Sequence, residues 1–154
     1  MKKNYIGTYA KIILLIIIIA LIIVGCVYFV QKQYIEENFQ TVKTNMLLIE
    51  AKVKVIAEKV TMKEKDVSYI GIKLSEMEED ESIKKLLENN VISLDEKNHT
   101  YYVLKKEHLD QLGLSNIEKK EGYYIVDYKE IDVIDSMGVK NIEGKLFYRL
   151  TEMK

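Results

Sequence analysis

The chain of 154 residues contains no proline, no tryptophan and only one cysteine. One cysteine excludes an internal disulfide framework, so a folded domain must be held together by its core alone. The absence of proline, together with only seven glycines, argues against a Pro-rich or Gly-rich stalk. The 23 basic and 24 acidic side chains leave a net charge of −1, so the basic excess typical of nucleic-acid binding is missing.

Catalytic and ligand-binding signatures are missing as well. The sequence has no G-x-S-x-G, no phosphate-binding loop and no H-E-x-x-H. The two histidines, His99 and His108, have no cysteine or carboxylate at metal-ligand spacing, and we expect both side chains to be solvated. We therefore predict no enzyme activity, no cofactor, no metal site and no small-molecule substrate.

Carboxylates cluster between positions 76 and 81. A calcium site is one interpretation, but the loop spacing and the glycine that such sites need are absent. The cluster directly precedes an apolar pattern at Ile83, Leu86 and Leu87. Because the positive end of the helix dipole lies at the N-terminus, acidic residues favour that position. We predict a short helix here that ends near Asn89 and Asn90.

One long hydrophobic run is present, from Ile12 to Val30, and it contains no charged residue. At about 1.5 Å per residue, such a helix matches the ~30 Å hydrocarbon core of a bilayer. Lys2, Lys3 and Lys11 precede the run, and this positive excess favours a cytoplasmic N-terminus. The sequence predicts a single-pass protein of the cell membrane. Its segments are a cytoplasmic basic N-terminus (1–11), a transmembrane helix (12–30), an amphipathic helix (31–62) and a small extracytoplasmic domain (63–154).

Cys26 lies within the hydrophobic run and allows a second interpretation. Ile23-Val24-Gly25-Cys26 resembles a lipobox, in which the cysteine is lipidated and becomes the new N-terminus. The residues after Cys26 remain apolar up to Val30, whereas a lipoprotein usually turns polar there. An uncleaved signal anchor therefore fits the segment better, with Cys26 as a small apolar residue in lipid. A secretory peptide that is cut by ordinary signal peptidase is a third alternative.

The helix is expected to continue beyond the membrane, because no helix breaker occurs from Gln31 to about Met62. Apolar residues alternate at spacings of four and three. This predicted packing face comprises Ile35, Phe39, Val42, Met46, Ile49, Val53, Ile56 and Val60. Further apolar residues at Leu47, Leu48, Ala51, Val55 and Ala57 widen it. A broad face favours packing on a sheet of the same chain, whereas a narrow one favours a coiled coil with a partner.

The remaining residues predict a small antiparallel meander of three to five strands. A short helix is expected at 105–112, closed by Gly113, and a tight turn at Lys129. Strands are indicated at 100–104, 123–128, 130–135, 139–140 and 146–150, and a short extended piece at 67–72 in the connecting segment before them. One sheet face should meet the long helix through Tyr124, Val126, Ile131, Val133, Leu146, Tyr148 and Leu150. The predicted fold class is α+β, a long N-terminal helix packed on a small antiparallel β-meander with short helices.

This layout, a basic start followed by an apolar helix, an amphipathic continuation and a C-terminal meander, resembles type IV pilins and pseudopilins. The segment GYYIVDYKEIDVIDSMGVKNIEGKLFYRL is similar to the tail of pilin-like proteins of Gram-positive bacteria. In that family a glutamate follows the cleavage glycine at the fifth position. Here the only candidate glycine is Gly7, and Ile12 stands where the glutamate would be.

The resemblance implies a non-enzymatic, membrane-anchored structural or assembly protein at the bacterial cell surface, of the kind found in pili and type II secretion. Its partners would be the lipid bilayer and copies of itself or other pilin-like secretion proteins. Two alternatives remain open: a bitopic coiled-coil scaffold of the divisome type, and a surface lipoprotein lipidated at Cys26. The helix face between Asn45 and Val60 discriminates the first two, because only a pilin-like domain buries that face on its own sheet.

Overall fold

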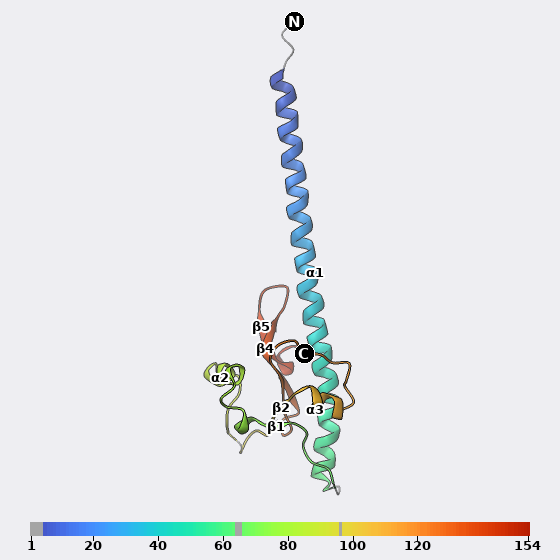
Figure 1. The fold of residues 1–154 in the computed structure, drawn as a ribbon, viewed down its shortest axis with the longest axis vertical. Helices are drawn as coiled ribbons and strands as arrows, with labels where there is room; N and C mark the ends of the chain where they lie inside the picture. The colour runs from blue at the N-terminus through green and yellow to red at the C-terminus, as the bar shows by residue number, and fades with distance from the viewer. Residues whose placement is uncertain (1–4, 64–65, 96) are drawn as a thin grey trace.

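A computed structural model describes residues 5–63, 66–95 and 97–154. Its main feature is one unbroken helix, α1 (Tyr5–Thr61), which extends far beyond a small C-terminal domain (Figure 1). Within the exposed middle of α1, side-chain hydrogen bonds one turn apart support the helix, from Gln33 to Glu37 at 3.0 Å and from Gln40 to Glu36 at 2.8 Å. The predicted continuation of the apolar helix beyond position 30 is therefore confirmed.

The domain is built on a five-stranded sheet with the order β1-β2-β3-β4-β5, in which every neighbouring pair is antiparallel. Its strands are β1 (Ile72–Lys73), β2 (Tyr101–Leu104), β3 (Tyr124–Asp127), β4 (Asp132–Lys140) and β5 (Leu146–Arg149). Two short helices, α2 (Glu81–Glu88) and α3 (Lys106–Gln111), and two 3-10 turns, η1 (Leu74–Glu76) and η2 (Leu150–Glu152), complete it. The predicted α+β fold with an antiparallel meander is confirmed.

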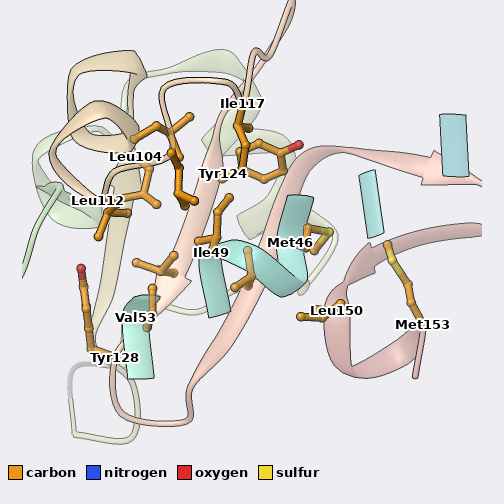
Figure 2. Packing of buried hydrophobic residues seen from close by; sticks show 14 of the residues in the cluster. Met46, Ile49, Val53, Leu104, Leu112, Ile117, Tyr124, Tyr128, Leu150 and Met153 are labelled. Carbon is orange, nitrogen blue, oxygen red and sulfur yellow. The ribbon is translucent and has the colours of Figure 1, made fainter. Parts of the chain in front are cut away.

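The two faces of the sheet bury alternate residues against different helices. Val126 and Val133 lie in the cluster that includes Met46, Ile49 and Val53 of α1. Figure 2 shows these α1 residues among Leu104, Tyr124 and Leu150 of the domain. The opposite face, which includes Ile125 and Ile134, packs on Ile83 and Leu86 of α2. The sheet therefore has a helix on each side, whereas the sequence predicted only the covering by α1.

Helix α2 begins where the acidic cluster predicted a helix N-terminus. Asp80 is the N-cap residue, and its Oδ1 accepts hydrogen bonds from the backbone N–H of Ser82 at 2.9 Å and from its hydroxyl at 2.6 Å. Glu81 occupies the first turn and Asn89 the C-cap. The carboxylates here stabilise a helix end, which agrees with the interpretation preferred over a calcium site.

The strand boundaries differ from the prediction in three places. Of the extended piece expected at 67–72, only Ile72 lies in a strand, where it forms β1 together with Lys73. The strand expected to run to Leu150 gives way to η2 there. The expected strands 130–135 and 139–140 form one strand, β4, with a bulge between Ile134 and Val139. A bulge inserts unpaired residues without ending the strand, so a break in the alternating pattern is no strand boundary.

The bulge also changes which residues of β5 face α1. Ile134 pairs with Arg149 and Val139 with Phe147, so five steps along β4 correspond to two along β5. An odd shift in pairing moves side chains to the other face of a sheet. Phe147 therefore joins the core beneath α1, Tyr148 packs on the α2 side, and Leu146 is exposed. The prediction that Leu146 and Tyr148 face the long helix was wrong for this reason. The other five residues of that predicted face do pack in the α1 cluster.

Gly138 forms part of this bulge with a φ of +67°, and a Cβ there would lie 3.0 Å from the carbonyl oxygen of Phe147. We expect Gly138→Ala to lower the free energy of unfolding by about 1–3 kcal/mol, because it adds a backbone clash to left-handed strain. Gly144 has a φ of +81° but open space around it, so Gly144→Ala carries the strain alone and should cost less. Chemical denaturation of both variants measures the difference, and equal losses would contradict a close packing at Gly138.

Candidate functional site

The N-terminal part of α1 is the first candidate for a functional element. All residues from Ile12 to Val30 are exposed, and none packs on the domain. One apolar helix near the N-terminus is long enough to cross a membrane, which fits a transmembrane or signal anchor. Cys26 is exposed within this stretch, on a helix that continues unbroken past it. The predicted basic residues Lys2 and Lys3 lie outside the described residues.

The predicted packing face of α1 lies on the sheet of its own chain, although not along its full length. Met46, Ile49 and Val53 are fully buried, and Phe39, Val42 and Ile56 are half-buried against the same core. The contact begins at Phe39, whose ring meets that of Phe147 edge-on with 5.6 Å between centroids. Ile35 is 37% exposed because it lies a turn nearer the apolar run than this first contact, and Val60 is only half-buried. Ile35 therefore lies on the predicted helix face but outside the part of it that packs on the sheet.

The residues that widened the predicted face have a different placement. Ala57 is buried, but Leu47, Leu48 and Val55 are 40%, 41% and 49% exposed, and Ala51 is exposed as well. At 3.6 residues per turn, these four residues lie on the side of α1 opposite Val53. The conclusion that α1 packs on its own sheet is confirmed, whereas the breadth of the apolar pattern was the wrong reason for it. We call these four residues the outer stripe.

Three buried aspartates, which the sequence analysis missed, hold the C-terminal domain together. Asp132 of β4 is 3% exposed, and its Oδ2 accepts a hydrogen bond from Arg149 Nη1 at 2.7 Å. Arg149 Nη2 also donates to the carbonyl oxygen of Val91 at 2.6 Å and to the Tyr101 hydroxyl at 3.0 Å. Burial raises the pKa of Tyr101, so this hydroxyl remains a neutral partner. The cluster joins β2, β4, β5 and the segment that follows α2.

The carboxylates of Asp135 and Asp127 also have hydrogen-bond partners, at opposite ends of the paired part of β3 and β4. Both carboxylate oxygens of Asp135 lie 2.7 Å from Lys119 Nζ. Asp127 is fully buried, and its Oδ1 accepts the backbone N–H groups of Thr100 and Lys129, each at 3.0 Å. A signal for these residues was available, since Asp135 lies within β4, and Asp127 and Asp132 directly adjoin apolar strand residues, where a solvated carboxylate would not fit.

His99 is bound by Asp127 rather than solvated. Its Nδ1 lies 2.6 Å from Asp127 Oδ2, and its ring stacks on Tyr101 with 4.9 Å between centroids. His108 is half-buried, and its Nδ1 accepts the backbone N–H of Lys105 at the start of α3. The prediction of two solvated histidines was wrong, because the carboxylate partner of His99 is distant in sequence and cannot be found from spacing.

The His99 ring borders a surface hollow of about 280 Å³ whose lining also includes Ser75, Glu78, Ser93 and Tyr102. A buried carboxylate on one ring nitrogen fixes an imidazole, as at many metal or catalytic sites. In the described part of the chain, however, no group of three His, Cys, Asp or Glu side chains is placed to hold a metal ion. Asp127 also closes the turn between β3 and β4, so its contacts give the pair a structural role.

The Tyr128 side chain binds the segment before β1 to the sheet through hydrogen bonds. Its hydroxyl donates to the carbonyl oxygen of Ile70 at 2.9 Å and accepts the Ile70 backbone N–H at 3.1 Å. Burial raises the pKa of Tyr128 to about 12, so the hydroxyl stays protonated over the physiological range. Tyr69 stacks on the Tyr128 ring at 4.4 Å, and Tyr102 meets it edge-on. This cluster of aromatic rings therefore closes one end of the core.

Comparisons of the chain with family models, curated proteins and solved structures found no match. The proposals below therefore rest on the chain's own residues and geometry.

Proposed function

We propose that this protein is a non-enzymatic, membrane-anchored structural or assembly protein of pilin-like type at the bacterial cell surface. The observation that carries the proposal is the continuity of α1, which extends as one helix from the apolar run into the core of the domain. Helix α1 would thus supply both the anchor and the surface that contacts neighbouring subunits within the membrane. Lys11 before the run supports a cytoplasmic N-terminus, with residues 31–154 outside.

The packing of α1 favours this proposal over a coiled-coil scaffold. Met46, Ile49 and Val53 are buried on the chain's own sheet, so the heptad face outside the membrane is not free to bind a partner helix. A lipoprotein processed at Cys26 would lose most of the apolar run, residues 12–25, although the helix continues through that position. Both alternatives remain outcomes of the experiments proposed here.

The proposal predicts that membrane segments of neighbouring copies touch along one helix face. A single cysteine, moved through positions 22 to 29 of a Cys26→Ser chain, should give disulfide-linked dimers when native membranes are oxidised. Because one face of a helix recurs every 3.6 residues, the yield should peak every three or four positions. Gel electrophoresis without reducing agent measures it, and Cys26→Ser alone is the control. The absence of dimers at all positions would contradict self-assembly through the membrane helix.

A further inference from the structure

The outer stripe of α1 is an apolar surface that is flanked by positive charge. Leu47, Leu48, Ala51 and Val55 lie on the side of the helix that faces away from the sheet. Lys54 borders the stripe on one side, and Lys52 and Lys59 on the other, and all three are exposed. From position 51 to its end at Thr61 the helix has three lysines and one glutamate, Glu58, which lies on the same side as the outer stripe. A partner for this surface needs some apolar area together with an excess of negative charge.

The opposite side of the same domain carries that negative charge. Five carboxylates occur between positions 76 and 81, where η1 leads into α2. Lys84 and Lys85 form ion pairs with Glu79 and Glu81, each at 2.7 Å. Glu76 is exposed and has no ion-pair partner among the described residues, and Glu78 next to it is half-buried. We call this region, residues 75–81, the acidic end of α2.

The two surfaces lie at matching heights on opposite sides of the domain. Figure 1 shows α2 beyond the sheet from α1 and level with the C-terminal part of α1. The two hydrophobic clusters give the same order of layers, with α1 on one face of the sheet and α2 on the other. Copies anchored in one membrane by α1 stand in the same orientation. The outer stripe of one copy is therefore level with the acidic end of α2 in its neighbour.

We propose that the outer stripe of α1 binds the acidic end of α2 in a second copy of this chain. The inference rests on the proposed function, because it requires copies anchored side by side in one membrane. A symmetric α1–α1 pair is disfavoured, since parallel helices would place Lys52, Lys54 and Lys59 next to their own counterparts. A contact between two different surfaces does not close on itself, so repetition produces a row of subunits. Confinement to the membrane raises the effective concentration and compensates for weak surface ion pairs.

Cysteine cross-linking of the full chain in its membrane distinguishes this contact from others. Val55→Cys and Ser75→Cys, each in the Cys26→Ser background, place one thiol in the outer stripe and one in the acidic end of α2 without changing any charge. A mixture of the two variants should form a dimer, and a chain that carries both should form a ladder of higher oligomers. Val55→Cys alone should give little dimer. A stronger dimer with Val55→Cys alone would show symmetric pairing, and no cross-link would show that no second copy binds; either result overturns the proposal.

Charge reversal tests the complementarity itself. Lys54→Glu with Lys59→Glu should lower the cross-linked fraction about tenfold, because two attractive pairs become repulsive. Adding Glu76→Lys and Glu78→Lys to the same chain should restore it. Lys140→Glu makes one such charge change on β4, away from both surfaces, and should have no effect. Equal loss with Lys140→Glu, or no rescue by the reciprocal reversal, would overturn the proposal. If cysteines within the membrane still cross-link after this contact fails, the proposed function survives without it.

Discussion

Replacement of Ile49 by alanine is expected to lower the free energy of unfolding by about 2–5 kcal/mol, the range for truncating a large buried aliphatic side chain. Ile49 is fully buried between α1 and the sheet, next to Met46 and Val53. A domain of this size has about 5–15 kcal/mol of stability in total, so the loss should be large. Chemical denaturation of the full chain in detergent micelles, followed by near-UV circular dichroism, measures it.

Val55→Ala is the matched control, because Val55 lies on the same helix with its side chain exposed to solvent. It removes a similar aliphatic side chain and should change stability by less than about 0.5 kcal/mol. If the two variants lost equal stability, or if Ile49→Ala had no effect, α1 would not be packed on the sheet of its own chain. A free α1 face would then support the coiled-coil alternative.

Arg149→Met is expected to lower the free energy of unfolding by about 3–5 kcal/mol. The variant leaves the carboxylate of Asp132 buried without its cation, and it removes the donor to Val91 and to the Tyr101 hydroxyl. Met fills much of the arginine volume, so the loss reports charge and hydrogen bonding more than packing. Thermal or chemical unfolding against the unchanged chain measures the effect.

A second substitution isolates the buried charge. Adding Asp132→Leu to Arg149→Met removes the unpaired carboxylate, and a buried ion pair can often be replaced by apolar residues at little cost. The double variant should therefore be more stable than Arg149→Met alone. If the second change instead lowered stability further by the full effect of a single Asp132→Leu, the two residues would act independently, and the ion pair would not be the cause.

The elements with strong local signals were predictable from sequence. The apolar run and the spacing of Met46, Ile49 and Val53 identified one long helix and the side of it that is buried. The carboxylates before Ile83 predicted the N-terminus of α2, because capping depends on neighbouring residues. These features depend on residues that are only a few positions apart, so the local sequence is enough to predict them.

The features that were missed depend on contacts between distant segments. The bulge between Ile134 and Val139 reverses the faces of Leu146 and Tyr148, and no local pattern in β5 reveals that shift. His99 meets Asp127 across 28 positions, and Arg149 meets Asp132 across 17. The outer stripe was assigned to the core because apolar composition alone does not distinguish an exposed face from a buried one. Pairing partners and layer order come only from the folded chain.

The proposed function depends on the continuity of α1, which joins the apolar run to the domain. The most direct test is the intact mass of the protein extracted from native membranes. We expect a chain that retains residues 12–30 together with the domain and has no lipid on Cys26. A chain that begins at Cys26 with a diacylglyceryl group, or one that has lost residues 12–30, would contradict the proposed uncleaved anchor.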